Sequence, residues 1–481
     1  MADGVRARGS WLRSDVPARL DRLPWSRWHL RLVLALGITW VLDGLEVTLV
    51  GAVAGVLSEP ATLHLSERQI GLAASGYLLG AILGALVFGR LTDALGRKRL
   101  FLVTLGVYTG ATLLTALSWG FGSFVLFRVL TGAGIGGEYA AINSAIDELM
   151  PARLRGRADL AINSTYWLGT ALGSASTLVL LDPHLLPPPI GWRACFAIGG
   201  ALGLAVLGVR RHVPESPRWL LLHGREHDAE RVIAAIESEV TRSLKRPLTG
   251  PAPPRALQVK GAAGFGVIAR VLLRQHLRRT ALGLSLMVAQ AFAYNAIFFT
   301  YALILGRFYG VSSDRVGLYL LPFAAGNLLG PLVLGKLFDT VGRRTMIALT
   351  YGLSGLLLAA TGWAFAQGWL TAVSQTALWC SVFFVASAAA SSAYLTVSEL
   401  FPVELRGLAI ALFFAIGTAA GGLVAPALFG ALIQSGSRTR VMHGYLLGAA
   451  LMLGAAAVAA VLGVAAEGRS LEALAAEPQA G

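Results

Sequence analysis

"FGRLTDALGRKRL", residues 88–100, and "LGKLFDTVGRRT", residues 334–345, are two nearly identical charged phrases in a very apolar chain. Each phrase closes an apolar run that is long enough to cross a bilayer, which takes about 20 residues. Each combines one aspartate, two glycines and a cluster of cations. A phrase that appears once in each half of a chain predicts an internal repeat.

The repeat extends well beyond these two phrases. A shift of 246 residues carries Gly71, Gly80, Gly84, Gly89, Leu91, Asp93, Gly96 and Arg97 onto Gly317, Gly326, Gly330, Gly335, Leu337, Asp339, Gly342 and Arg343. A shift of 251 residues carries Glu148, Leu149, Pro151, Leu154, Arg155 and Gly156 onto Glu399, Leu400, Pro402, Leu405, Arg406 and Gly407. Two parallel repeats related by an axis along the membrane normal are a known transporter architecture.

The composition requires lipid as solvent for most of the chain. Of its 481 residues 55% are hydrophobic and 14% are charged, and the mean hydropathy is +0.66, whereas a soluble domain averages about 25% charged residues. The net charge of +14 falls in short clusters between apolar stretches, as in cytoplasmic loops, rather than in a nucleic-acid-binding surface. The two cysteines, Cys195 and Cys380, have neither disulfide nor metal-site spacing, so we expect no metal and no cofactor.

We predict an all-α integral membrane protein with twelve transmembrane helices in two pseudo-symmetric six-helix bundles. The predicted spans lie near 29–54, 67–90, 100–118, 122–149, 157–181, 191–210, 280–306, 314–337, 345–366, 370–398, 408–433 and 441–464. The expected domains are a cytoplasmic N-terminal tail (1–28), an N-terminal bundle (29–210), a cytoplasmic central loop (211–279), a C-terminal bundle (280–464) and a cytoplasmic C-terminal tail (465–481). Cation-rich and cation-poor loops alternate, which places both termini in the cytoplasm.

Several motifs together resemble the major facilitator superfamily. Gly89 to Lys98 is similar to the G-x-L-x-D-x-x-G-R-[RK] loop between its helices 2 and 3, and Gly335 to Arg344 is similar to the second copy. The spacing Arg128-x-x-x-Gly132-x-Gly134-x-Gly136 resembles its helix-4 signature. "PESPRWL", residues 214–220, and "ELFPVELRG", residues 399–407, resemble the sugar-porter branch and its organic-ion relatives. The resemblance implies a transporter rather than an enzyme.

The charged phrases are candidates for a cytoplasmic gate. A carboxylate at a helix end can accept hydrogen bonds from a neighbouring helix start and from nearby arginines, and such a cluster would hold the halves together until the transporter opens inward. The predicted gating residues are Gly89, Asp93, Gly96, Arg97, Gly335, Asp339, Gly342, Arg343, Glu148, Arg155, Glu399 and Arg406. The alternatives are that the cations only set topology and that the glutamate–arginine pairs are ordinary salt bridges.

Four ionisable residues lie inside predicted spans and away from the span ends, where a charge is costly and usually functional. Asp43 and Glu46 lie in the first span, and Arg128 and Glu138 lie in the fourth. Arginine stays charged while a buried carboxyl group can titrate, so an acid–Arg128 pair can act as a proton-coupled switch. Asp43-Gly44-Leu45-Glu46 resembles the D-G-x-D phrase of aromatic-acid–proton symporters, and Glu46 and Arg128 resemble the pair of sugar–proton symporters. A permanent ion pair and, for Glu138, a cationic substrate group are the alternatives.

Polar and aromatic residues inside spans are candidates for lining a substrate cavity. They are Asn163, Tyr166, Trp167, Gln290, Tyr294, Asn295, Asn327 and Tyr394. For each of them interhelical hydrogen bonding or packing is the alternative. The stretch 289–295 lacks the first Gln and the Gly of the sugar-porter pattern Q-Q-x-x-G-x-N, so several partners that a hexose needs are missing. This favours a small organic acid, in particular an aromatic one, with a sugar second.

We therefore predict proton-coupled symport of a small organic solute by alternating access. The expected partners are the solute, protons and the lipid bilayer but no nucleic acid, and we expect a monomer in the plasma (inner) membrane. A proton-coupled exporter of drugs or metabolites and a uniport facilitator remain open. A sensor or a membrane-bound enzyme is disfavoured, because the sequence has no Walker motif and its glycine runs lie in apolar spans.

Overall fold

The computed structural model describes residues 11–210, 214–245, 247–248, 253–258, 274, 276–400 and 412–463. The N-terminal half contains α2 (Arg27–Leu57), α3 (Glu67–Leu95), α4 (Arg97–Ala116), α5 (Phe121–Leu149), α6 (Ala152–Leu180) and α7 (Pro188–Arg210). The C-terminal half contains α11 (Leu277–Phe298), α12 (Tyr301–Tyr309), η1 (Ser313–Arg315), α13 (Val316–Thr340), α14 (Arg343–Ala366), α15 (Ala372–Leu400), the π-helical turn η2 (Thr418–Gly422), α17 (Val424–Gln434) and α18 (Arg438–Leu462).

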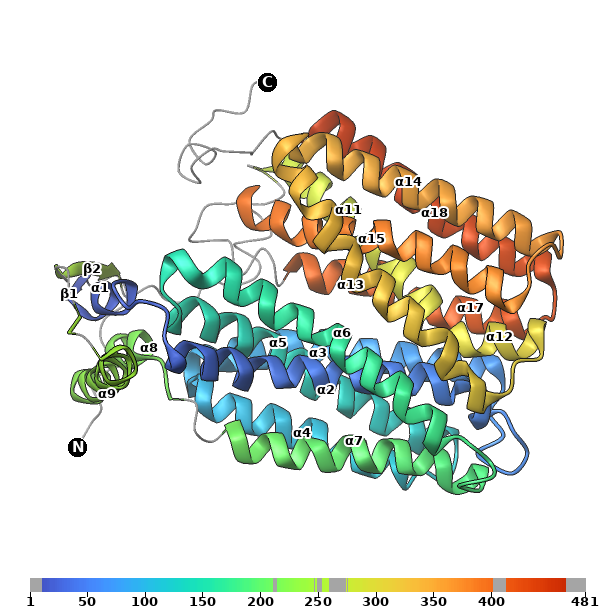
Figure 1. Cartoon of the computed structure of the whole chain (residues 1–481), viewed down its shortest axis with the longest axis horizontal. Helices are drawn as coiled ribbons and strands as arrows, with labels where there is room; N and C mark the ends of the chain where they lie inside the picture. Colours follow the sequence, from blue (N-terminus) through green and yellow to red (C-terminus); the bar gives the residue numbers. More distant parts are fainter. Residues whose placement is uncertain are drawn as a thin grey trace.

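Long helices run back and forth between the same two ends of the molecule (Figure 1). Ten of the described helices are long and apolar enough to cross a membrane; among them, Leu412–Gln434 includes η2 and α17. Helices α5 and α6, of 29 residues each, run beside these ten, and α11 and α12 together form one crossing. The predicted fold of twelve spanning helices in two six-helix halves is therefore confirmed.

Glycines bring the paired helices of each half into backbone contact, and they do so in the same register in both halves. A Cβ added at Gly84 of α3 would collide with the carbonyl group of Ala133 in α5, and one added at Gly330 of α13 would collide with that of Phe384 in α15. The two contacts are equivalent in the repeat: a shift of 246 residues carries Gly84 onto Gly330, and a shift of 251 residues carries Ala133 onto Phe384. Close approach at small residues is how membrane helices associate in the absence of a hydrophobic driving force.

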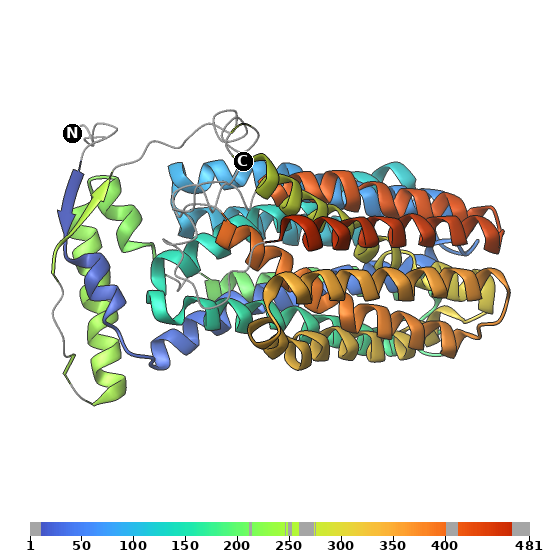
Figure 2. The same ribbon diagram turned by 90° about the horizontal axis from the view of Figure 1, so that it is seen from above.

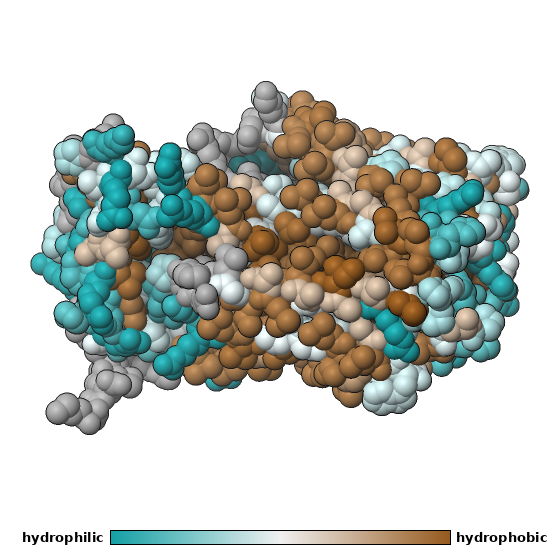
Figure 3. Space-filling model, turned by 60° about the horizontal axis from the view of Figure 1, so that its bottom comes forward, coloured by the Kyte–Doolittle hydropathy of each residue, from teal (hydrophilic) through white to brown (hydrophobic). Residues whose placement is uncertain are grey.

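An apolar band covers the middle of the face shown in Figure 3, between two hydrophilic ends. Large aliphatic side chains are exposed along the helices, including Leu83, Leu126, Leu332 and Leu353. Water would penalise a continuous exposed surface of this kind, and acyl chains would not. The band therefore marks the part of the chain that faces the bilayer.

A small domain covers one end of the N-terminal half; we call this the capped end of the molecule and the opposite one the loop end (Figures 1 and 2). The small domain consists of β1 (Trp11–Ser14), α1 (Val16–Asp21), α8 (Pro217–Leu222), α9 (Glu226–Leu244) and β2 (Arg255–Gln258). Strands β1 and β2 pair antiparallel, an element that the sequence analysis did not predict. The tail before the first span and the central loop thus fold together.

Ion pairs and an apolar core hold this small domain together. Arg19 contacts both Glu237 (2.6 Å) and Glu230 (2.8 Å) of α9. The apolar face of α9 includes Ile233 and Ile236, which belong to one core with residues of α1 and α2.

The two halves are in close contact toward the loop end. Ser75 of α3 donates a hydrogen bond to the carbonyl oxygen of Leu423 (2.6 Å) in the C-terminal half. Gly51 of α2 lies against the carbonyl oxygen of Phe298 in α11, and Gly317 of α13 lies against Ser174 of α6. No side chain could be added at either glycine without separating the halves, so this end of the interface is closed.

Candidate functional site

A buried ion pair lies in the middle of the N-terminal half. Arg128 of α5 donates through Nη1 to Oε1 of Glu46 in α2, and the two side chains are 1% and 0% exposed. The Arg128 guanidinium also lies 5.0 Å from the ring centre of Tyr77 and 5.5 Å from that of Phe196. These contacts offset part of the cost of burying the cation. The sequence analysis expected Glu46 and Arg128 to meet, and in the structure they do.

Asp43 lies one helical turn from Glu46 and has different partners. Tyr77 of α3 donates a hydrogen bond to Oδ1 of Asp43 and Tyr139 of α5 donates one to Oδ2, each at 3.0 Å. Glu138, on the same helix as Tyr139, is also buried and lies within electrostatic reach of Tyr108 in α4. The four ionisable residues predicted inside the spans therefore lie in one region, with two tyrosines that the sequence analysis did not select.

An aromatic wall extends from this region across the interface between the halves. Tyr166 of α6 and Tyr294 of α11 share a hydrogen bond of 2.8 Å between their hydroxyl groups. Trp167 packs against both rings, with centroids 5.1 and 6.4 Å away. Three predicted cavity residues are thus brought together, and they come from both halves.

The wall includes three further aromatic side chains that the sequence analysis did not select. Trp40 lies edge-on to Tyr139, with ring centroids 4.3 Å apart, and Tyr139 is stacked on Phe414 of the C-terminal half at 5.6 Å. The criterion that selected Tyr166, an aromatic group with a polar atom inside a span, would also have selected Tyr77 and Tyr139. No sequence signal distinguishes Phe414 from the many other phenylalanines of the spans.

The predicted amide residues do not all join the wall. The side-chain amides of Asn295 and Asn327 donate to carbonyl oxygens of their own helices, those of Ala291 (2.7 Å) and Phe323 (3.0 Å). Both residues are buried, so these donors serve the helix backbone in this conformation. Asn163 and Gln290 are half-buried in α6 and α11.

The charged phrases lie at the capped end, where each forms a turn between two helices. Gly96 precedes α4 with φ +85°, and Gly342 precedes α14 with φ +106°. These values are accessible to glycine but strained for other residues, which explains why both copies keep a glycine there. The backbone N–H of Lys98 donates to Glu215 (3.2 Å), and Nε of Arg344 donates to the carbonyl oxygen of Ala460 (2.9 Å).

The structure describes only some of the remaining predicted gating residues. Gly89 and Gly335 lie in α3 and α13, Glu148 is half-buried near the end of α5, and Arg343 is half-buried at the start of α14. The side chains of Asp93, Arg97, Arg155, Asp339, Tyr394 and Glu399, and the whole of Arg406, lie outside the described residues.

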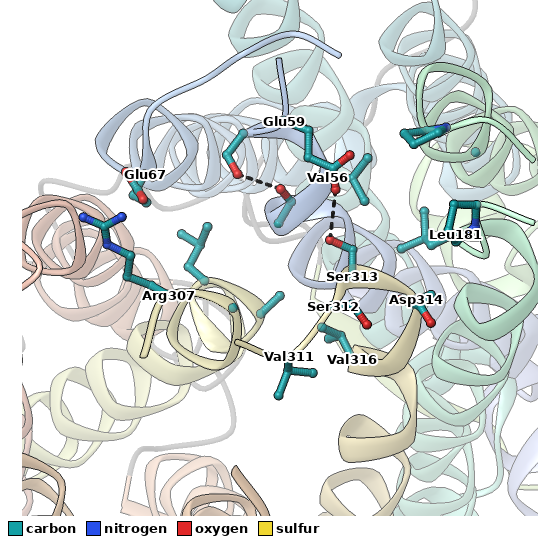
Figure 4. Close-up of a pocket in the computed structure, with 18 residues that line it drawn as sticks. Val56, Glu59, Glu67, Leu181, Arg307, Val311, Ser312, Ser313, Asp314 and Val316 are labelled. Atoms are coloured by element: carbon teal, nitrogen blue, oxygen red, sulfur yellow. Dashed lines mark hydrogen bonds between the residues drawn. The ribbon is translucent and has the colours of Figure 1, made fainter. Parts of the chain in front are cut away.

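A cavity of about 430 Å³ lies at the loop end, lined by both halves. Glu59 and Glu67 line it from the N-terminal half, and Arg307, Ser313 and Asp314 line it from the C-terminal half. Glu59 accepts a hydrogen bond of 3.5 Å from Ser313, and Arg307 extends toward Glu67 (Figure 4). Burial raises the pKa of Glu59 above its usual value. Within the described ranges, no group of three or more His, Cys, Asp or Glu side chains is placed to hold a metal ion.

The chain is similar to several membrane transporters. It is 26% identical over 462 residues to the niacin transporter of Acinetobacter baylyi, with 96% of this chain and 99% of the relative covered. It is also 26% identical over 408 residues to the 4-hydroxybenzoate transporter of the same organism, covering 84% and 85% of the two chains. Among solved structures, a D-xylose–proton symporter matches with a TM-score of 0.67 at 20% identity, over 89% of this chain and 97% of that one.

These likenesses define the class of protein: a multi-pass membrane transporter, not an enzyme. A model of the sugar (and other) transporter family matches residues 44–477, which is most of the chain. The protein therefore belongs to this family of the major facilitator superfamily.

Proposed function

We propose that this protein imports a small organic acid, preferably an aromatic one, together with protons across the inner membrane by alternating access. The observation that carries the proposal is the buried Glu46–Arg128 pair beside a wall of aromatic side chains shared by both halves. The likeness to transporters of niacin and 4-hydroxybenzoate supports the aromatic acid, and the likeness to a D-xylose–proton symporter supports proton coupling. Sugars remain the second substrate class.

Proton coupling follows from the different chemistry of the two partners. Arg128 keeps its charge under all physiological conditions, whereas Glu46 can accept a proton. Protonation of Glu46 removes its negative charge and weakens its bond to the guanidinium, which keeps its contacts with the rings of Tyr77 and Phe196. The freed donors of Arg128 can then turn toward a substrate carboxylate, so proton and anion would enter together.

The aromatic wall is suited to a planar ligand. Tyr166 and Tyr294 satisfy each other's hydroxyl groups, and a ligand carboxylate or hydroxyl could replace that bond with one from each half. Trp167 and Trp40 offer ring faces and edges, which contribute about 0.5–1.5 kcal/mol per aromatic pair beyond burial. A ligand in this position would contact both halves, so its binding would affect each of them.

Membrane orientation and assembly are part of the proposal. The capped end, with the charged phrases, would face the cytoplasm together with both termini, because basic segments remain on that side. The closed loop end would then face outward, and the structure would represent a form closed to the outside. The phrases at Asp93 and Asp339 would act as the inner gate in a monomer.

The test is transport into sealed vesicles that contain the purified protein. Radiolabelled 4-hydroxybenzoate, niacin and xylose are offered separately, with the vesicle interior more alkaline, equal or more acidic. We expect the aromatic acids to accumulate only with an alkaline interior, and Glu46→Gln to abolish accumulation while it retains exchange. Glu239→Gln, an exposed acid of the small domain, is the matched control and should transport normally.

The alternatives give different results in the same vesicles. Accumulation driven by an acidic interior would establish a proton-coupled exporter, and flux that ignores the pH gradient would establish a uniporter. Accumulation of xylose alone would move the substrate to the sugars. Persistent accumulation in Glu46→Gln would exclude Glu46 as the coupling residue.

A further inference from the structure

Asp43 is linked to the C-terminal half through both of its hydrogen-bond donors. The ring of Tyr77, which binds Oδ1, lies 6.0 Å from that of Phe299, at the break between α11 and α12. The ring of Tyr139, which binds Oδ2, is stacked on Phe414 at an interplanar angle of 24°. One carboxyl group of α2 is therefore connected by two tyrosines to two separate places in the opposite half.

Glu46 is connected to the C-terminal half less directly. Its partner Arg128 lies over Phe196 of the same half and over Tyr77, whose ring contacts Phe299, so this connection needs one more side chain than that of Asp43. The two acids of α2 thus differ in what surrounds them: one is held by a cation of its own half, and the other by hydroxyl groups whose rings pack against the other half.

The hydrogen-bonding capacity of a carboxyl group makes this arrangement sensitive to a proton. An ionised carboxylate can accept from both tyrosines, and each such bond is charge-assisted. A protonated carboxyl group donates from one oxygen, so it cannot keep two equivalent tyrosine donors. One tyrosine hydroxyl then accepts from the carboxyl group or turns away. In both cases a charge-assisted bond is lost, and the ring that carries the hydroxyl is held less firmly against Phe299 or Phe414.

Resting on the proton-coupled transport proposed above, we propose that Tyr77 and Tyr139 are positioning residues that transmit the ionisation state of Asp43 to the C-terminal half. With Asp43 ionised, the two rings are fixed and the described arrangement of the halves is favoured. With Asp43 protonated, one aromatic contact between the halves is weakened, and the halves rock more readily.

Other ionisable groups surround Asp43 and contribute to the same field. The charged and titratable side chains that interact electrostatically with Asp43 or its tyrosines are Glu46 of α2, Arg128 of α5, Tyr108 of α4, Tyr166 of α6 and Tyr294 of α11. Glu138 of α5 interacts in turn with Tyr108. Tyr108 is a useful comparison, because it is fully buried near the same acids and its hydroxyl makes no hydrogen bond within the described residues. The charges should therefore act on Tyr108, but Tyr108 should not affect the contacts between the halves.

The experiment measures conformation rather than flux, so it needs no substrate. Ser75→Cys places a thiol in the closed part of the interface, where Ser75 is 7% exposed and lies against Leu423 of the C-terminal half, in a background with Cys195 and Cys380 replaced by serine. The rate of labelling by a membrane-impermeant maleimide, corrected for thiol ionisation with a model peptide, is measured against pH in lipid nanodiscs. We expect the otherwise unaltered protein to change its labelling rate with pH as the loop end opens.

Removing the tyrosine hydroxyls should change this pH response. Tyr77→Phe and Tyr139→Phe should each move its midpoint upward by on the order of one pH unit, since the ionised form loses a charge-assisted bond. Phe414→Leu should reduce the amplitude and leave the midpoint in place, and Tyr108→Phe should change neither. A double Tyr77→Phe, Tyr139→Phe variant with an unaltered response would overturn the inference and leave coupling through Glu46 intact. A labelling rate that ignores pH before any tyrosine is changed would refute the coupling itself.

Discussion

The two halves share a scaffold and differ in what they bury. Both begin the helix after the charged phrase with a positive-φ glycine, Gly96 and Gly342, and both bring glycine-lined helices into backbone contact. Yet the shift of 251 residues that aligns α5 with α15 places Trp379 at the position of Arg128 and Ala389 at that of Glu138. The N-terminal half buries charges where the C-terminal half buries a ring and a methyl group.

A second shared feature lies at the loop end. Arg193, at the start of α7, donates to the carbonyl oxygens of Ala116 (2.6 Å) and Ser118 (2.9 Å) at the end of α4. Arg438, at the start of α18, donates to the carbonyl oxygen of Phe365 (3.3 Å) near the end of α14. Each arginine satisfies carbonyl groups that a helix end leaves without partners.

The comparison shows which parts of a repeat must be symmetric. In the proposed mechanism, rigid-body rocking requires that both halves be stiff and similarly shaped, which fits the repeated helix contacts and end caps. A proton would need only one place to bind, and among the described residues the buried charges of the spans lie in one half. The other half would supply aromatic surface for the proposed ligand, including Tyr294, and it contributes the rings that contact Tyr77 and Tyr139.

The largest expected effect comes from breaking the charge asymmetry at Arg128. Arg128→Ala leaves Glu46 buried without its cation, which should lower the free energy of unfolding by about 3–5 kcal/mol. Adding Glu46→Gln should recover part of the loss, because it removes the uncompensated charge. The free energies of unfolding of the single and the double variant are measured in lipid bicelles. At the equivalent position of the C-terminal half, Trp379→Ala should lower the free energy of unfolding by about as much, because it leaves a cavity. Removal of an acid should not restore this loss.

If Arg128→Ala is no less stable than the double variant, the uncompensated charge of Glu46 does not account for the loss, and the charge asymmetry of the halves has no energetic basis. Glu239→Gln with Arg128→Ala serves as the control for a non-specific effect of removing any acid. It should leave the loss unchanged.

The sequence predicted the scaffold well because local sequence patterns determine it. Apolar runs of spanning length, the two charged phrases and the glycine spacing determine the twelve helices and their pairing. The sequence also predicted that Arg128 would pair with an acid of the first span, because charges deep inside spans are few. It left Asp43 and Glu46 open, and in the structure the partner is Glu46.

The sequence did not reveal contacts that depend on how the halves are placed. Phe414 and Phe299 resemble every other phenylalanine of the spans until Tyr139 and Tyr77 are seen beside them. The small domain was missed because its stability comes from pairing segments more than 200 residues apart, such as Trp11 with Gln258. The acids of α9 and the arginines of the tail were visible, but nothing local indicated that they meet.

The arginine caps allow a finer comparison of the halves. Arg438 also donates to Phe308 (2.9 Å) and lies over three aromatic rings, at 4.8–5.4 Å from their centres, whereas Arg193 lies over Trp192 alone at 4.4 Å. Arg438→Ala should therefore lower stability by about 2–3 kcal/mol and Arg193→Ala by about 1–2 kcal/mol. Thermal unfolding of the two variants in the same lipid shows which of them loses more stability. A larger loss for Arg193→Ala would mean that the carbonyl bonds, rather than the rings, dominate the caps.

The smallest expected effect concerns the small domain, whose contacts within the described part of the chain are with the N-terminal half. Burial pushes the pKa of Glu237 upward, but hydrogen bonds from Arg19 and Arg22 outweigh it and hold the pKa below its usual value. A lowered pKa in the folded state means that the stabilisation is complete above the ordinary pKa of a glutamate and is lost as the pH falls through the lowered value. Glu237→Gln should remove about 1 kcal/mol or less at neutral pH.

Amide hydrogen exchange in residues 11–22 measures this difference at neutral and acid pH. Glu237→Gln should speed exchange there at neutral pH and leave little further change on acidification, whereas Glu239→Gln, which removes a more exposed pair with Arg31, should behave like the unaltered protein. Equal protection in all three would show that the tail is held by its apolar core and strand pairing alone. The N-terminal half would then carry its extra domain without any electrostatic contribution, and the charge asymmetry between the halves would be confined to the membrane interior.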